Sequence, residues 1–281
     1  MTGPVVVGVD GCAANVSAVR WAAREARRRR LPLLLLHSWT DRPLDPPPLR
    51  GADRGRRYGE QVLRRTAADL RHAYPGLVLA TELVPEPAAE ALVGLSASAD
   101  LLVLGARSRD SVAGFLLGST GLHVLGLARC PAVSVRDGES AAGAGRNEIV
   151  VGVRGAGTAA EPLLDFAFTT AGSRGARVLA VRATDPPSAT AGPLDPVRAA
   201  AEADRLAAAV APWREKFPDV PVTELVVPGP AARVLPAVSA HNRLTVVGRG
   251  RHAAPAPWRL GAVAHSALLH APGPVAVVPH G

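Results

Sequence analysis

Short apolar runs alternate with longer amphipathic segments along the whole chain. In the amino-terminal half, strands are predicted at the unbroken apolar runs near residues 5–9, 33–37, 77–83, 101–105 and 132–136. The segments between these runs are long enough for crossover helices, and such alternation is typical of parallel strands whose two faces are covered by helices. The pattern therefore predicts a doubly wound α/β fold.

The first predicted helix begins near Asn15, a residue type that favours the N-cap position. Its apolar residues recur at helical spacing and predict the face that covers the sheet. These residues are Val16, Val19, Ala22, Ala23 and Ala26. The segment 41–51, which contains four prolines, is predicted as a surface loop before the second helix.

The two halves of the chain repeat each other with an offset of about 144 residues. VVVGVD at 5–10 matches IVVGVR at 149–154, and LLVLGARS at 101–108 matches LTVVGRGR at 244–251. A repeat of this length indicates a duplicated domain. We expect a first domain at 1–137, a small polar linker at 138–147 and a second domain at 148–281, whose strands begin near 149, 178, 222, 244 and 275.

The composition supports two buried cores, because 48% of the 281 residues are hydrophobic. No stretch approaches the roughly 18 apolar residues of a membrane span, and the first residues lack the features of a signal peptide. Cys12 and Cys130 are too far apart for a thiolate metal motif or a disulfide scaffold. We expect a cytoplasmic protein without membrane association.

The net charge of +8 raises the question of a nucleic-acid partner. The basic excess is divided evenly between the halves, and the arginine run at 27–30 is predicted to end a helix, where cations complement the dipole. Aromatic residues make up only 4% of the chain, too few for stacking platforms. We therefore expect no nucleic-acid partner.

Residues suited to phosphate binding follow the predicted strands, at the sheet edge where doubly wound folds bind ligands. Glycines let the backbone approach a ligand, and a helix start offers free N–H groups, to which Ser and Thr add hydroxyl donors. The residues concerned are Asp10 and Gly11 after the first strand, Gly105, Arg107 and Ser108 after the fourth, and Gly118, Ser119 and Thr120 at the next helix start. Together they indicate a phosphate site without a P-loop.

The spacing G-x2-G-x9-G-[ST] after a strand, preceded by V-V-G-V-D-G, resembles the nucleotide-binding signature of the universal stress protein family. Ser108 stands where that motif has its second glycine. The likeness covers both halves, so the chain resembles the tandem members of actinobacterial type. It implies two Rossmann-like sheets of strand order 3-2-1-4-5, with Asp10 and Gly105 at the point where the order reverses.

The resemblance also implies ATP, an adenine nucleotide, as the ligand of the first domain, and leaves open whether Mg²⁺ accompanies it. Adenosine would lie near Asp10, His37 and Ser38, with Trp39 as a candidate wall, and the phosphates would lie over the glycine segment. We interpret His37 as a sheet-end histidine with a satisfied hydrogen bond rather than as an acid or base. For Cys12, beside this site, redox sensing is a hypothesis.

The second half departs from the motif. Arg154, Arg251 and Ala262 stand where the first half has Asp10, Ser108 and Ser119. Losing a carboxylate and a hydroxyl while gaining a bulky cation removes most of the implied contacts, so we expect a degenerate site. Arg249 and Arg251 leave binding of some other anion open.

Other enzyme classes lack a required residue. The segment 248–253 reads G-x-G-x-x-A, yet the acidic residue that a dinucleotide site needs is missing, because no Asp or Glu follows Glu224. Lys216, the only lysine, lies far from any glycine loop, which argues against a Walker A ATPase or a kinase. The motif offers no general base beyond Asp10, so we expect no enzyme, with slow ATP hydrolysis left open.

Two functions remain. The first is a non-catalytic, ATP-binding stress-response protein that signals to an unknown protein partner. The second is an interaction module in which both sites are vestigial. The resemblance also implies that the fifth strands of the two domains pair within the chain as a pseudo-dimer, and it leaves a homodimer open.

Overall fold

The computed structural model describes residues 3–40, 49–106, 118–136, 146–155, 157, 160–184, 196–240, 242–250 and 260–280. The chain divides into two compact units, Met1–Ser140 and Ala141–Gly281. No helix in these described ranges has the length and apolar character needed to cross a membrane.

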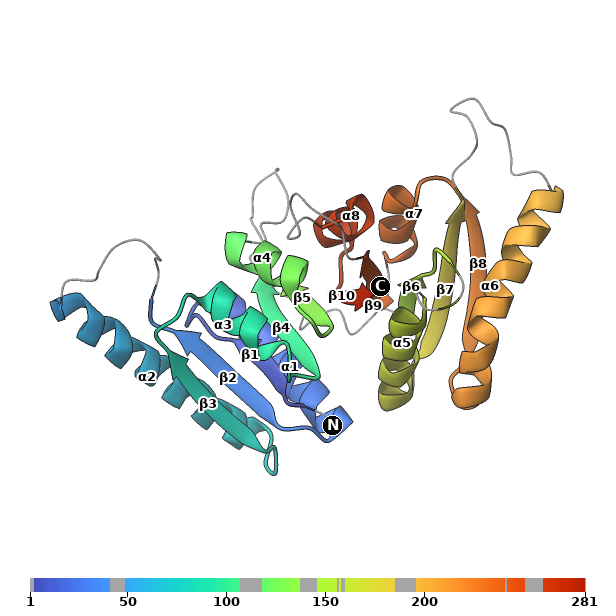
Figure 1. The fold of residues 1–281 in the computed structure, drawn as a ribbon. Coiled ribbons are helices and arrows are strands. Elements are labelled where there is room, and N and C mark those ends of the chain that lie inside the picture. Colours follow the sequence, from blue (N-terminus) through green and yellow to red (C-terminus); the bar gives the residue numbers. More distant parts are fainter. Residues whose placement is uncertain are drawn as a thin grey trace. The chain divides into compact units, whose positions relative to one another are not determined.

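The first unit is a parallel sheet with helices on both faces (Figure 1). Its described strands are β1 (Val5–Gly8), β2 (Leu33–Ser38), β3 (Leu79–Val84), β4 (Leu101–Ala106) and β5 (Ala132–Arg136). Its helices are the 3-10 turn η1 (Ala13–Asn15), α1 (Val16–Arg29), α2 (Leu49–Ala73), α3 (Ala88–Leu95) and α4 (Ser119–Leu127). The strand order is β3-β2-β1-β4-β5, which confirms the predicted fold class and order.

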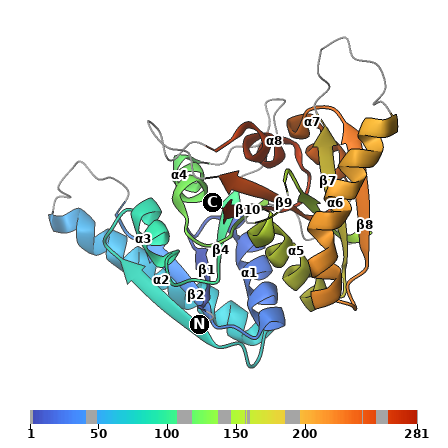
Figure 2. The same ribbon diagram turned by 45° about the vertical axis from the view of Figure 1, so that its right-hand side comes forward.

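The second unit repeats this plan (Figure 2). Its described strands are β6 (Arg146–Gly152), β7 (Arg177–Thr184), β8 (Val222–Pro228), β9 (Asn242–Gly250) and β10 (Val275–His280). Its helices are α5 (Glu161–Arg174), α6 (Pro196–Lys216), α7 (Ala231–Val238) and α8 (Ala262–His270). The strand order β8-β7-β6-β9-β10 is equivalent to that of the first unit, and all the pairs are parallel.

The inner strands are apolar without interruption because both of their faces are covered. Val5, Val6 and Val7 of β1 are fully buried, as are their neighbours in β4. Helices α1 and α2 pack against one face of this sheet, and α3 and α4 pack against the other. The core of the first unit therefore lies on both sides of β1 and β4, and the carboxyl ends of these strands are left to form a site.

Helix α1 covers the sheet with small residues, but its predicted face is wrong at one end. Ala22, Ala23 and Ala26 are buried as predicted, whereas the side chain of Val16 is 46% exposed. Val16 lies about 120° around the helix from Ala22 and therefore at the margin of the buried stripe. Its place against the sheet is taken by Ala18, which is fully buried.

Two other predictions about the first unit need correction. The loop predicted at 41–51 ends earlier, because α2 already begins at Leu49; residues 41–48 lie outside the described residues. Asn15 does occupy the N-cap position of α1, but its side chain makes no capping hydrogen bond. Of the linker predicted at 138–147, residues 138–145 are not described, and residues 146 and 147 belong to strand β6.

Candidate functional site

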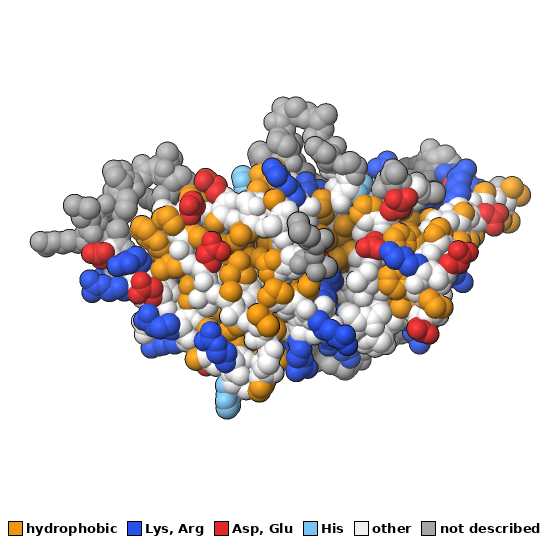
Figure 3. Space-filling view, turned by 60° about the horizontal axis from the view of Figure 1, so that its bottom comes forward, with side chains coloured by type: hydrophobic (Ala, Val, Ile, Leu, Met, Phe, Trp, Pro, Cys, Tyr) orange, Lys and Arg blue, Asp and Glu red, His pale blue; other side chains and the backbone are white. Residues whose placement is uncertain are grey.

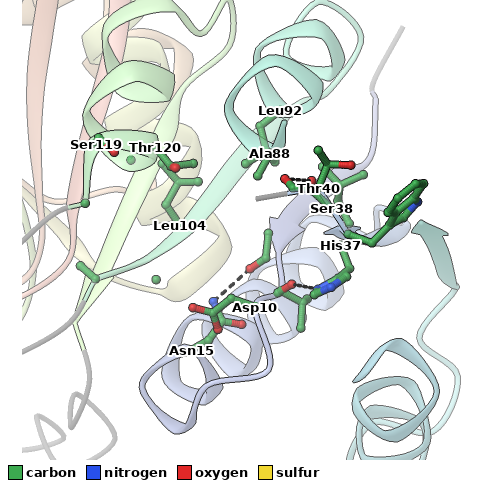
Figure 4. A pocket seen from close by; sticks show the side chains of 18 of the residues that line it. Asp10, Asn15, His37, Ser38, Thr40, Ala88, Leu92, Leu104, Ser119 and Thr120 are labelled. Carbon is green, nitrogen blue, oxygen red and sulfur yellow. Dashed lines mark hydrogen bonds between the residues drawn. The ribbon is translucent and has the colours of Figure 1, made fainter. Parts of the chain in front are cut away.

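A cavity of about 620 Å³ lies at the carboxyl ends of β1 and β4, where the strand order of the first unit reverses. Most of the predicted site residues line it, including Asp10 and the start of α4 (Figure 4). The predicted residues in its wall are Asp10, His37, Ser38, Gly105, Gly118, Ser119 and Thr120. Gly11 follows Asp10 without lining the cavity, and Arg107 and Ser108 lie outside the described residues.

The turn after β1 presents Asp10 to the cavity. The Oδ1 atom of Asp10 accepts a hydrogen bond from the Cys12 backbone N–H at 2.9 Å, which holds the carboxylate at the turn. Gly11 has a φ of 79°, and a Cβ atom there would lie 2.7 Å from the hydroxyl of Tyr58. Both its conformation and its neighbour therefore require glycine at this position.

Asn15 forms part of the cavity wall, a role that the sequence did not reveal. Its Nδ2 donates a hydrogen bond to the Gly8 carbonyl at 3.0 Å, and the residue is only 7% exposed. A Cβ atom on Gly105 would lie 2.7 Å from this Nδ2. Gly105 is thus needed to make room for Asn15, in addition to any approach of a ligand to its backbone.

At the end of β2, the polar side chains are already engaged with backbone carbonyls. His37 is buried, and its Nδ1 lies 2.6 Å from the Val9 carbonyl oxygen, which accepts the hydrogen bond. This confirms the interpretation of His37 as a satisfied sheet-end histidine. The Ser38 hydroxyl donates to the Glu86 carbonyl at 2.6 Å. These bonds shape the wall and leave both side chains with little freedom.

The start of α4 is suited to bind an anion. Gly118 is the N-cap, no described atom beyond its chain neighbours lies within 4 Å of where its Cβ atom would be, and the first turn contains no acidic residue. The first N–H groups of a helix have no partner within it and lie at the positive end of its dipole. Ser119 and Thr120 add hydroxyl donors beside them and lie across the cavity from His37 and Ser38 (Figure 4).

Helices α2 and α3 and the ends of β2 and β4 supply an apolar and aromatic wall. Trp39 lines the cavity, as the sequence suggested. The sequence did not reveal the contributions of Tyr58, Ala88 and Leu92, because they come from amphipathic helices that carry no motif. The only signal was the pair of glycines in α2, Gly55 and Gly59, which lies on the face of that helix towards β2.

In the second unit, the equivalent region at the carboxyl ends of the strands carries charged side chains. Arg182 of β7 occupies the register position of His37, and Glu202 of α6 lies where α2 has Gly59. Arg182 pairs with Glu202 and donates through Nη1 to the Arg154 carbonyl at 2.6 Å. Hydrogen bonds from Arg182, and more weakly the nearby Arg205, hold the pKa of Glu202 below its ordinary value. In the first unit, by contrast, Gly59 packs directly against the ring of His37. An ion-pair cluster thus takes the place of this contact in the second unit.

The rest of this region also lacks the groups found in the first unit. Gly248 is the counterpart of Gly105, and a Cβ atom on it would lie 2.7 Å from the imidazole of His280. The neighbour of Gly105 in the first unit is instead the side-chain amide of Asn15. Burial, and then the charge of Arg249, lowers the pKa of that imidazole. Helix α8 keeps a glycine N-cap, yet Ala262 and Val263 replace the two hydroxyl residues of α4. Arg251 lies outside the described residues.

Comparison with known proteins supports the fold and the duplication. The model of the Universal stress protein family matches residues 1–136 and again 145–279. Universal stress protein Rv2623 of Mycobacterium tuberculosis is 35% identical over 260 residues, which cover 88% of this chain and 86% of that protein. Universal stress protein Rv2005c of the same organism is 31% identical over 286 residues, covering 97% and 96%.

A solved structure shows the same fold at low sequence identity. The crystal structure of a universal stress protein from Archaeoglobus fulgidus aligns over 100% of both chains with a TM-score of 0.76 and 14% identity. The similarity to the mycobacterial proteins extends over most of the chain at 30% identity or more. The chain therefore belongs to the universal stress protein family and carries two copies of its domain in tandem.

Proposed function

We propose that the first unit binds ATP, or another adenine nucleotide, in the cavity between β1 and β4. The observation that supports this most strongly is the pairing of one carboxylate, Asp10, with the helix start at Gly118 to Thr120 in the wall of a single cavity. The cavity volume of about 620 Å³ lies within the roughly 300 to 1,000 Å³ range of small-molecule sites.

The charges give the nucleotide an orientation. The ionised carboxylate of Asp10 only accepts hydrogen bonds and repels phosphate, so it suits hydroxyl or amine donors of the nucleoside. The N–H groups and hydroxyls at the start of α4 suit the phosphates. The nucleoside would therefore lie towards β1 and β2, against the apolar side chains of Ala88 and Leu92, and the phosphates towards α4.

The proposed role is binding rather than turnover. Asp10 is the only carboxylate among the described residues of the cavity wall, and the proposal places it at the nucleoside end. His37 is buried and bonded to the Val9 carbonyl, so it is poorly placed to take a proton from water at the phosphates. We propose that occupancy by the nucleotide is signalled to a protein partner, as a stress-response function requires.

The second unit is proposed to have lost this adenylate site. Arg154 replaces the carboxylate, and the hydroxyl side chains at the helix start are missing. Its cluster of Arg182, Glu202 and Arg205 uses its charges internally. We therefore expect one nucleotide-binding site per chain, in the first unit.

Titration calorimetry of the full chain with ATP, with and without Mg²⁺, tests the proposal. Asp10→Ala should weaken ATP binding by about 10- to 100-fold, the cost of one hydrogen bond to a charged group. Arg154→Ala, the matched change in the second unit, should leave the affinity unaltered. Equal affinities for the unaltered chain and Asp10→Ala, or flat titrations at millimolar ATP, would contradict the proposal and favour an interaction module.

A further inference from the structure

Tyr58 is an aromatic side chain that lines the cavity while remaining 52% exposed. It extends from α2, and nothing in the motif that follows β4 concerns this helix. Exposed aromatic rings beside a cavity are suited to bury the apolar surface of a ligand, because the ring has a large apolar area and little rotamer entropy to lose.

The ring of Tyr58 has neighbours on two sides. His37 contacts it edge to face, with ring centroids 6.1 Å apart and planes at 64°. Its hydroxyl lies 2.7 Å from the position that a Cβ atom on Gly11 would take. Tyr58 therefore lies between the end of β2 and the turn that carries Asp10, which is the end of the cavity assigned to the nucleoside.

Two glycines allow α2 to bring the ring this close. A Cβ atom on Gly59 would lie 2.5 Å from the His37 ring, and one on Gly55 would lie 3.1 Å from the Trp39 carbonyl oxygen. Residues 55, 58 and 59 share one face of a helix at i, i+3 and i+4 spacing. The same face thus supplies both the close approach and the aromatic side chain.

The second unit provides an internal comparison. At the positions of Gly55, Tyr58 and Gly59, helix α6 carries Arg198, Ala201 and Glu202. The aromatic residue and the two small residues are lost together, in the unit that has also lost the carboxylate after its first strand. This joint loss is expected if Tyr58 serves the ligand and is not explained by the shared fold.

We infer that Tyr58 stacks on the base of the bound nucleotide and makes the first unit selective for ligands that carry a planar base over free polyphosphate. The inference rests on the proposed nucleotide binding. It adds a specificity determinant outside the glycine motif, supplied by a helix on the opposite side of the cavity from the phosphates. Stacking on an aromatic side chain tolerates different bases, so selectivity concerns the presence of a base.

The test compares calorimetric affinities for ATP and for inorganic tripolyphosphate, a probe without a base. Tyr58→Ala and Tyr58→Leu should weaken ATP binding, the alanine variant by roughly 5- to 150-fold, because stacking on one ring accounts for that range. Tyr58→Phe should keep ATP affinity within about threefold. None of these changes should alter the affinity for tripolyphosphate.

Tyr74→Ala is the matched control, because Tyr74 is the only other tyrosine of the chain. Tyr74 directly follows the last residue of α2, and its ring contacts the guanidinium group of Arg27. It should leave ATP affinity unchanged, and circular dichroism should show all variants folded. ATP binding that survives both Tyr58→Ala and Tyr58→Leu overturns the inference and leaves the proposed function intact. An equal loss for ATP and tripolyphosphate also overturns it. An unaltered chain that binds no ATP overturns the proposed function itself.

Discussion

Glu25 is a carboxylate on the buried face of α1, where no solvent reaches its side chain. Arg29, one turn later, holds it at 2.8 Å through Nε and reaches Asp100 at 3.0 Å through Nη1. A buried charge is tolerated when it is paired and hydrogen-bonded, whereas removing one partner leaves an uncompensated charge. The stability of the first unit therefore depends on Arg29 more than on any exposed arginine of its surface pairs.

Arg29→Ala should lower the free energy of unfolding of the first unit by about 3 to 5 kcal/mol, because it removes the ion pair with Arg29 from the buried carboxylate of Glu25. Urea unfolding followed by circular dichroism measures the change. Arg64→Ala is the control, since Arg64 is 69% exposed and pairs loosely with Glu60, and it should cost less than about 1 kcal/mol. Similar costs for the two variants would refute this reading of the buried pair.

The two cysteines differ in reactivity. Burial raises the pKa of the Cys130 thiol to about 12, so this thiol stays protonated at neutral pH, while Cys12 is exposed in the turn after Asp10. A thiol reagent at pH 8 should modify one cysteine per native chain, and Cys12→Ser should abolish this fast reaction. After denaturation both thiols should react. Two fast thiols in the native chain would show that the burial of Cys130 is wrong.

At the scale of elements, the contact between α2 and β2 distinguishes the two units. In the first unit, Gly59 lets the helix close on His37; in the second, Glu202 reaches across to Arg182. A larger residue at Gly59 alone would clash with His37. Loss of either Arg182 or Glu202 alone would break their ion pair. This paired difference separates a wall suited to a ligand from an ion-pair cluster within the same fold.

Gly59→Ala should therefore destabilise the first unit by about 1 to 3 kcal/mol, because the added Cβ atom would lie 2.5 Å from His37. Thermal unfolding and the affinity for ATP both report the displacement of α2. Gly94→Ala, in helix α3, is the matched control: its Cβ atom would meet nothing within 4 Å. That change should be neutral or stabilise by up to about 1 kcal/mol. An unaltered melting temperature for Gly59→Ala would contradict the close approach.

The strands could be predicted from the sequence because inner parallel strands are apolar throughout. The predicted strand at 132–136 coincides with β5, and the others differ from β1 to β4 by at most two residues at an end. The start of α2 could not be predicted, because the four prolines upstream of it favour a loop and say little about where the loop stops. Val16 was misplaced because the stripe of α1 is set by tertiary contact with the sheet.

The site was predicted in part. The residues that follow strands, such as Asp10 and Gly105, come together because the carboxyl ends of parallel strands meet at one edge of the sheet. Asn15 and Tyr58 were missed, since one resembled an ordinary helix cap and the other belongs to a helix without a motif. Asn15 and Tyr58 reach the cavity because a glycine of a neighbouring segment, Gly105 or Gly11, leaves room for them. These neighbours are known only from the packed structure.

At the scale of the whole molecule, one fold is present twice with unequal chemistry. The net charge of +8 is spread through the chain, and on the face shown in Figure 3 basic side chains are interspersed with acidic and hydrophobic ones. Among the described residues of that face, the basic side chains do not form the continuous stripe expected of a nucleic-acid-binding surface. Pairing of the fifth strands within the chain, a homodimer and the identity of the protein partner all stay predictions.

The number of ATP molecules bound per chain is the measurement that tests the central claim most directly. Equilibrium dialysis of the full chain against ATP, at concentrations well above the dissociation constant, counts filled sites without reference to mechanism. The account predicts one ATP per chain, half-saturated at about 10- to 100-fold higher ATP in Asp10→Ala and at unaltered ATP in Arg154→Ala. Two ATP molecules per chain, or none at millimolar ATP, would contradict it.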